Sequence, residues 1–416
     1  MLKPVNWWFQ FPLALRQVVK VRFLASLGAG GVVYMTPLIF HQANLSASEI
    51  GQGLAASAII GFVSRLSCGL FLDRGLACSW PICLAGILSI FANFVLVHAV
   101  EFANYLGGQL LIGMAAGFYF PAIELSVPLS CSNFPPRRGY ALARSADALG
   151  IAMGTSAGVI ASSLSIIRAV YIIEIITASI TILILGRRPL TDKRADIAQL
   201  QAGDNSKDKC FSTRPSQNWL LPLLPIFALT IVVTATITLR QSALPLDLVH
   251  GSLERPPLSV TWSGALVALQ LGILVLLQWP VGSWVAQRNL HFGLGIGLAA
   301  LGIGSMLIAL SSLYSRGLML ILVAELLLAF GEAAFLPTAT DAIIRKAPIE
   351  FQGLAMALFS QCFAISASTV PLFAGVLLDI QGNGLLLWLS AAIICILMLP
   401  ILGSIKSSAT LLSIPD

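Results

Sequence analysis

Charged residues are scarce in this chain. Only 10% of its 416 residues are Asp, Glu, Lys or Arg, whereas 57% are hydrophobic. Soluble domains carry about 25% charged residues, so the composition argues against a soluble protein. The net charge of +6 does not indicate nucleic-acid binding in so apolar a chain, because Lys and Arg of membrane proteins collect in cytoplasmic loops. We expect the protein to contact a lipid bilayer and no nucleic acid.

Signals of catalytic or cofactor chemistry are also missing. The seven cysteines form no CxxC pair, the four histidines show no metal-ligand spacing, and no phosphate-binding G-x-x-x-x-G-K-S/T loop occurs. Residues 154–158 satisfy the hydrolase pattern G-x-S-x-G, but they lie inside an apolar helix rather than between a strand and a helix. We therefore expect no metal, no cofactor, no enzymatic activity and no direct use of ATP.

Long apolar segments fill most of the chain. A membrane helix needs about 20 mostly apolar residues. We expect twelve such helices, at residues 22–41, 49–72, 79–99, 104–129, 139–162, 169–186, 219–240, 259–285, 291–313, 317–344, 353–378 and 384–403. The sequence thus predicts an all-α integral membrane protein with two six-helix bundles, at residues 1–186 and 219–416, joined by a polar cytoplasmic linker at 187–218.

The distribution of basic residues predicts the orientation of these helices. With the N-terminus inside the cell, 19 of the 24 Lys and Arg residues fall on the inner side, including Arg22 at the start of the first segment. Arg65 lies within a helix, and four fall outside, namely Arg168, Arg240, Arg255 and Arg316. This asymmetry favours twelve spans in the cell membrane, with both termini in the cytoplasm.

The two halves of the chain repeat one another. Gly51 and Gly69 both recur as glycines 213 residues later, and residues 117–122 and 139–143 have counterparts 216 and 214 residues later. Duplicated six-helix halves are typical of secondary transporters, whose substrate site lies near the bilayer midplane between the halves. The repeat therefore predicts two pseudo-symmetric bundles.

Two motifs carry a resemblance to a known family. Residues 69–75, Gly-Leu-Phe-Leu-Asp-Arg-Gly, are similar to the loop after the second helix of the major facilitator superfamily, G-x-x-x-D-R-x-G-R-R/K, without its basic pair. Residues 150–159 are similar to the family's fifth-helix pattern G-x-x-x-G-P-x-x-G-G, with Thr155 in place of the proline that is associated with antiporters. The resemblance covers nearly the whole chain and implies a monomeric permease that moves a small molecule by alternating access.

Charged residues near the inner ends of three helices are candidates for a conformational switch. The resemblance implies that Asp73 and Arg74 latch the inner gate in one state and release it in the other. Arg144 and Asp147 are three residues apart and share a helix face, so they could join Glu124 in the same network. The alternative is a set of static salt bridges. The complete set of gating candidates is Gly69, Asp73, Arg74, Glu124, Arg144 and Asp147.

Three further charged residues lie deep in the predicted helices. An arginine such as Arg65 is costly in lipid unless it is paired or hydrated, so it either binds an anionic substrate group or pairs with a neighbour. Its surroundings resemble the second helix of nitrate and organic-anion porters of the same superfamily, but Gln278 occupies the position of their second arginine, which argues against nitrate. Glu325 and Glu332 share a helix face, and burial favours the protonated form of a carboxylate, so they either carry a proton or are structural.

Uncharged polar residues in two of the predicted helices are further candidates. Thr230, Thr234 and Thr238 recur every four residues and could line a substrate cavity with Gln270 and Gln278. The alternative is that the threonine hydroxyls bind carbonyls of their own helix, which is their usual state in membranes.

Three glycines, Gly150, Gly154 and Gly158, recur at the same spacing on one face of the fifth predicted helix. Small residues at this spacing allow two membrane helices to approach closely. We expect these glycines to serve helix packing.

The sequence as a whole predicts a secondary active transporter coupled to protons. Efflux of amphiphilic compounds, as by an antiporter, is the first expectation for its activity, because the helices are apolar and contain aromatic residues. A porter of a small organic or inorganic anion bound by Arg65 is the second. A receptor or assembly factor that has the same fold without transport is the third.

Overall fold

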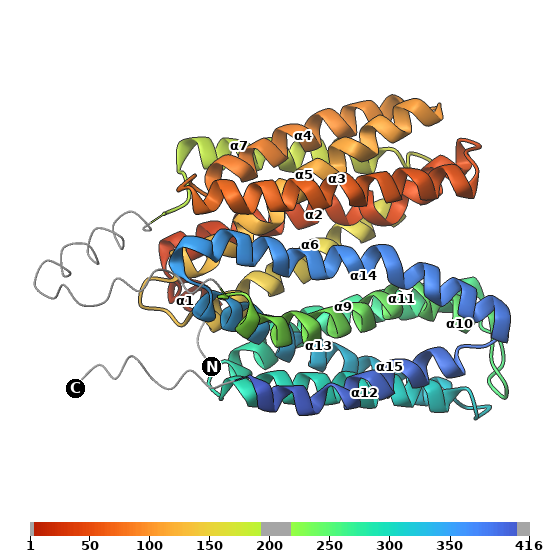
Figure 1. The fold of residues 1–416 in the computed structure, drawn as a ribbon. Helices are drawn as coiled ribbons and strands as arrows, with labels where there is room; N and C mark the ends of the chain where they lie inside the picture. The colour runs from red at the N-terminus through yellow and green to blue at the C-terminus, as the bar shows by residue number, and fades with distance from the viewer. Residues whose placement is uncertain (1–3, 193–217, 406–416) are drawn as a thin grey trace, which may run out of the picture. The chain divides into compact units, whose positions relative to one another are not determined.

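The computed structural model describes residues 4–192 and 218–405, and every regular element in these ranges is a helix (Figure 1). The first half contains α1 (Pro4–Phe9), α2 (Leu13–Gln42), α3 (Ala47–Asp73), α4 (Ser79–His98), α5 (Phe102–Cys131), α6 (Pro136–Ser163) and α7 (Ala169–Arg187). The second half contains η1 (Leu221–Leu223), α9 (Leu224–Ser242), α10 (Leu244–His250), α11 (Val260–Val285), α12 (Leu290–Ser311), α13 (Leu318–Lys346), η2 (Ile349–Phe351), α14 (Gln352–Gln381), α15 (Leu385–Leu397) and η3 (Leu399–Ser404).

All twelve expected long helices are present in the described ranges. Eleven helical segments are long and apolar enough to cross a membrane. The twelfth, expected at residues 139–162, forms α6, which has 28 residues but carries Arg137, Arg138, Arg144 and Asp147. Of the expected linker at 187–218, residues 193–217 lie outside the described residues.

The start of the first long helix differs from the expectation. The sequence predicts a start at residue 22, whereas α2 begins at Leu13 and runs for 30 residues. Arg22 therefore lies inside the helix, with only 1% of its surface exposed, and is not a loop charge. The structural reason is that Arg22 has acidic partners on other helices, which a hydropathy pattern cannot show.

The described helices form two compact units. Of the described residues, the first unit contains 4–192 together with 349–364, and the second contains 218–348 together with 365–405. The bundles expected from the sequence placed 349–364 with the second half, whereas the contacts of this segment group it with the first unit.

The first unit is held by pairs of closely packed helices. α2 packs against α6 and α7, α3 against α5, and α4 against α5 and α7. At the α2–α6 crossing, a Cβ atom on Gly150 would lie 2.7 Å from the carbonyl oxygen of Phe23, and one on Gly154 would overlap the carbonyl oxygen of Leu27. A Cβ atom on Gly158 would lie 2.8 Å from Met35 Cγ. The glycine stripe thus lies against α2, where side chains would separate the two helices.

In the second unit, glycines likewise allow two helices to approach closely, at the crossing of α12 and α13. α12 packs against α13 and α15, and α11 packs against α13. A Cβ atom on Gly297 would lie 3.0 Å from the carbonyl oxygen of Gly331, and one on Gly331 would lie 2.8 Å from the carbonyl oxygen of Gly297. These reciprocal approaches bring the α12 and α13 backbones together.

Candidate functional site

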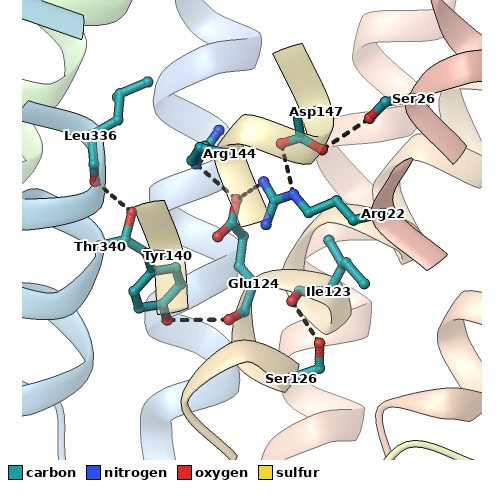
Figure 2. Close-up of polar contacts among 10 residues, drawn as sticks. All are labelled: Arg22, Ser26, Ile123, Glu124, Ser126, Tyr140, Arg144, Asp147, Leu336 and Thr340. Atoms are coloured by element: carbon teal, nitrogen blue, oxygen red, sulfur yellow. Dashed lines mark hydrogen bonds and ion pairs between the residues drawn. The ribbon is translucent and has the colours of Figure 1, made fainter. Parts of the chain in front are cut away.

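A buried cluster of four charged side chains connects three helices of the first unit (Figure 2). Arg22 of α2 binds Glu124 of α5 through Nη2 at 2.7 Å and Asp147 of α6 through Nε at 2.6 Å. Arg144 of α6 binds the same Glu124 oxygen at 2.8 Å. Glu124 is therefore shared by two guanidinium groups, and the cluster joins α2, α5 and α6.

The charges of this first cluster balance. Two arginines face two carboxylates, and Arg22 and Glu124 are 1% and 2% exposed. Buried charges are tolerated only when they are paired and hydrogen-bonded. Ser26 Oγ donates to the Asp147 carboxylate at 2.9 Å, and Tyr140 Oη donates to the main-chain carbonyl oxygen of Glu124 at 3.1 Å (Figure 2). Arg22 Nη1 and Glu124 Oε2 have no hydrogen-bond partner in the described structure, so the charges are paired but not every polar atom is satisfied.

Arg22 is the member of this cluster that the sequence did not single out. A usable signal is present, since six of the nine residues from Leu13 to Val21 are apolar, although Arg16, Gln17 and Lys20 interrupt them, and they extend the first apolar segment toward the N-terminus. The expected members Glu124, Arg144 and Asp147 do lie together.

Asp73 has backbone partners in the same unit. Its two carboxylate oxygens accept hydrogen bonds from the N–H groups of Gly353 at 2.6 Å and Leu354 at 2.9 Å, in the first turn of α14. A carboxylate stabilises a helix N-terminus by binding its free N–H groups and by its charge. Arg74, the C-cap of α3, is exposed. Gly69 lies beside the same turn, since a Cβ atom there would lie 2.9 Å from the Gly353 carbonyl oxygen.

Two more contacts hold the start of α14 within the first unit. The Arg144 guanidinium lies 6.0 Å and 5.4 Å from the ring centres of Phe359 and Phe363. Gln361 Nε2 donates to the carbonyl oxygen of Phe62 at 2.8 Å. Arg144 thus belongs both to the charged cluster and to the surface that receives residues 349–364.

Arg65 lies in α3 without an acidic partner among the described residues. It is 8% exposed, and its Nε atom makes no hydrogen bond. Its guanidinium lies 5.8 Å from the ring centre of Phe120 on α5, a cation–π contact. The charge of Arg65 is therefore not neutralised by an ion pair within the described part of the chain.

A second cluster of buried charges lies in the second unit. Arg240 of α9 faces two carboxylates of α13, with Nε 3.7 Å from Glu325 and Nη2 3.5 Å from Glu332. With its amide oxygen turned toward the guanidinium, Gln270 of α11 accepts hydrogen bonds from Nε at 2.8 Å and Nη2 at 3.2 Å. Arg240 and Glu325 are each 1% exposed, and Glu332 is 9% exposed.

Arg240 is the second residue that the sequence misplaced. We expected it on the outer side, as the last residue of the helix at 219–240, whereas it lies within α9 and is buried. The expected shared face of Glu325 and Glu332 is present, since both carboxylates approach this one guanidinium. Gln270 joins them, whereas Gln278, which is 2% exposed, has an Nε2 atom without a hydrogen-bond partner in the described structure.

The threonine stripe donates its hydroxyl hydrogens within α9. Thr230, Thr234 and Thr238 donate to the carbonyl oxygens four residues earlier, at 2.7, 2.8 and 2.9 Å. Thr234 Oγ1 also lies 2.8 Å from Ser366 Oγ. The threonines therefore adopt the second arrangement considered from the sequence, in which their hydroxyls bind carbonyls of their own helix.

A further buried pair, absent from the sequence-based candidates, ties α10 to its neighbours. Asp247 binds Arg255 at 3.0 Å and accepts hydrogen bonds from the Gly384 N–H at 3.0 Å and Trp388 Nε1 at 3.2 Å. Arg255 in turn donates to Ser311 Oγ at 2.7 Å. All four bonds stay within the second unit, so we assign this pair a structural role.

Comparison with known proteins defines the fold. No protein-family model matches the chain, and no curated protein matches it in sequence. Solved structures do match: the major facilitator superfamily transporter FucP in an outward conformation has a TM-score of 0.75 at 15% identity, over 95% of this chain and 99% of its own. The human organic anion transporter MFSD10 (TETRAN) has a TM-score of 0.69 at 14% identity, over 94% and 98%.

A third similar structure is a transporter of the POT family in complex with a thioalcohol-conjugated peptide. Its TM-score is 0.64 at 14% identity, over 93% of this chain and 94% of its own. The chain therefore has the fold of the major facilitator superfamily, as the sequence predicted.

Proposed function

We propose that this protein is a secondary active transporter that moves a small molecule across the cell membrane by alternating access, driven by protons. The proposal is supported by the shared fold with solved transporters, among them the E. coli fucose:proton symporter FucP. The inner excess of basic residues supports a placement with both termini in the cytoplasm. We take the working unit to be the monomer.

The observation that carries the proposal is the charge imbalance at Arg240. One guanidinium faces Glu325 and Glu332, so the cluster carries a net charge of −1 when both carboxylates are ionised and is neutral when one binds a proton. A net charge buried in an apolar helix bundle is costly, so uptake of one proton is favoured. The same three side chains therefore provide a binding site for a single proton.

Glu332 is the better candidate for the exchanging proton. It is 9% exposed, whereas Glu325 is 1% exposed, so water reaches Glu332 more readily. Both contacts with Arg240, at 3.5 Å for Glu332 and 3.7 Å for Glu325, are longer than the 2.6–2.8 Å pairs of the first cluster and therefore weaker, so the exposure to water decides between the two glutamates. We propose that Glu332 binds and releases the coupled proton and that Arg240 and Gln270 position it.

The test uses the purified full-length protein in liposomes that contain the pH indicator pyranine. Tetraphenylphosphonium, ethidium, benzoate and L-fucose are added in turn, and a compound that moves protons identifies a substrate class. With that compound, Glu332→Gln should lose proton movement at least about tenfold but keep substrate counterflow, because exchange requires no net proton transfer. The control is Glu254→Gln, at an exposed loop position.

Three outcomes bear on the proposal in different ways. Full proton coupling in Glu332→Gln contradicts the assignment of the proton site. Equal loss of coupling in Glu254→Gln indicates a general defect of reconstitution. Failure of every compound to move protons or to exchange favours a receptor or assembly factor over a transporter.

We propose that the first unit contains the conformational switch. Asp73 binds the first turn of α14 and Arg144 lies over Phe359 and Phe363, so two gating candidates hold the segment 349–364. Release of these contacts would free this segment while Arg22, Glu124 and Asp147 keep their own ion pairs. The support is that both contacts are noncovalent and polar, so they can form and break within a transport cycle.

For the substrate, we propose efflux of amphiphilic compounds, and one observation favours an anion porter as the second candidate. Arg65 is buried without an acidic partner in the described ranges, and an anionic substrate group would neutralise it. Thermal stability of the native protein and of Arg65→Gln, against lipophilic cations and small anions, separates the two. Stabilisation by an anion that disappears in the variant supports the porter. Stabilisation by cations that is unchanged in the variant supports efflux.

A further inference from the structure

The first unit contains a cavity that none of the candidates above explains. It has a volume of about 200 Å³ and lies among α2, α4, α5 and α7. Most of its lining residues are alanine, glycine, valine, isoleucine or phenylalanine, and small side chains such as Ala29, Ala116 and Ala178 create the space. No lysine, arginine or histidine is among the lining residues. The cavity therefore accepts an apolar body and offers it no positive charge.

The one ionisable carboxylate that lines this cavity is Glu174 of α7. Its Oε1 atom accepts a hydrogen bond from Ser89 Oγ at 2.8 Å, whereas its Oε2 atom is buried and makes no hydrogen bond in the described structure. A Cβ atom on Gly28 of α2 would overlap Oε2, so this oxygen occupies space that is open only because residue 28 has no side chain. A buried acceptor without a donor is unfavourable, so this atom is suited to a ligand that brings an N–H group.

The surrounding hydrogen bonds fix the orientation of Glu174. Asn93 Nδ2 donates to Ser89 Oγ at 3.1 Å and to the Ser89 carbonyl oxygen at 2.7 Å. The Ser89 hydroxyl hydrogen is thereby directed to Glu174 Oε1, and Oε2 is left as the free acceptor. Tyr119 also lines the cavity, and its buried hydroxyl makes no hydrogen bond among the described residues. Glu174 Oε2 and Tyr119 Oη thus lack hydrogen-bond partners, and because both atoms are covered, a bound polar group reaches them when these side chains turn toward the cavity.

The neighbouring charged cluster does not neutralise Glu174. Ser26 lines the cavity, but its hydroxyl donates to Asp147, and Arg22 is occupied by Asp147 and Glu124. The arginines of the first cluster are thus engaged by their own carboxylates. A cation for Glu174 must therefore come from outside the set of residues that line the cavity.

We propose that this cavity binds a small amphiphilic monocation, with an ammonium N–H donated to Glu174 Oε2 and an apolar body packed against the small residues of α2, α5 and α7. An alkylammonium ion of about six carbons matches a space of about 200 Å³. A neutral molecule of the same size fills the space but leaves the charge of the carboxylate unpaired. The site is separate from Arg240, Glu325 and Glu332, and its test requires no transport.

The test compares n-hexylammonium with n-hexanol, its uncharged counterpart, on the full-length protein in detergent. Both ligands are titrated against thermal stability, because a ligand that binds the folded state raises the melting temperature. In the native protein, hexylammonium should bind at least about tenfold more tightly than hexanol, the effect of one charge-assisted hydrogen bond. Glu174→Gln should abolish this difference. Glu101→Gln, at an exposed position of the same unit, should preserve it.

A second variant keeps the carboxylate and removes the space. Ala116→Leu places a larger side chain in the cavity and should abolish binding of both ligands. If Glu174→Gln does not fold, this variant decides the matter: loss of hexylammonium binding supports the site, and unchanged binding overturns it. Equal affinity of the native protein for the two ligands also overturns the proposal, as does a preference for the ammonium ion that survives in Glu174→Gln.

Discussion

Each unit contains a buried cluster of charged side chains, but the two clusters differ in charge balance and in distance. In the first, two arginines face two carboxylates at 2.6–2.8 Å. In the second, one arginine faces two glutamates at 3.5–3.7 Å. A balanced cluster with short bonds fixes helices in place, whereas an unbalanced one with long contacts favours the binding of a proton. We propose that this difference separates a structural junction in the first unit from a proton site in the second.

The largest loss of stability is expected when the first cluster is given the charge ratio of the second. Arg22→Met leaves Arg144 alone with Glu124 and Asp147, and so produces the same one-to-two ratio. Removing one partner from a buried charged network costs roughly 3–5 kcal/mol, because a buried charge is left uncompensated. Thermal unfolding of the purified protein measures the loss. Lys20→Met, at an exposed position on the same helix, should be close to native. Equal stability of the two variants would show that the equal number of arginines and carboxylates in the first cluster does not stabilise the protein.

A smaller effect is expected for a carboxylate that binds backbone N–H groups. Asp73→Asn keeps the size of the side chain and removes its charge from the first turn of α14. Loss of such a cap costs about 0.5–2 kcal/mol, less than the loss of Arg22. The melting temperature provides the measurement, with Arg74→Gln, at the exposed C-cap of α3, as the control. A loss as large as that of Arg22→Met would mean that Asp73 belongs to the charged cluster.

The reverse change, giving the second cluster the balance of the first, should have little effect on stability. Glu325→Gln leaves Arg240 with Glu332 in a one-to-one pair, so no charge remains uncompensated. We expect a change of at most about 1 kcal/mol, and a gain in stability is compatible with the argument. The melting temperatures of Glu325→Gln and of Glu124→Gln should be compared. The second variant removes a carboxylate that two arginines share, so its loss should be several times larger.

The helices were predictable from the sequence, whereas the partners of the charges were not. All twelve long helices were expected from the sequence, and eleven of them are long and apolar enough to cross a membrane, whereas α6 carries four charged residues. The same criteria of length and hydropathy placed Arg22 and Arg240 at the ends of the expected helices 22–41 and 219–240 and did not predict their burial, because hydropathy treats every charge as an exposed one. Arg22 lies 102 residues from Glu124 in sequence, and their pairing follows from tertiary packing. Glu325 and Glu332 were predictable because they share a face of a single helix.

The smallest effects are expected for uncharged polar residues of the second unit. Thr238 donates its hydroxyl hydrogen to its own helix, so Thr238→Val should cost about 0.5 kcal/mol or less. Thr234 also contacts Ser366 Oγ at 2.8 Å, so Thr234→Val should cost more, about 1 kcal/mol. Thermal unfolding of both variants tests the order. Once a substrate is known, its binding should change little in Thr238→Val. A large loss of binding in this variant would indicate that the threonine stripe lines the substrate site.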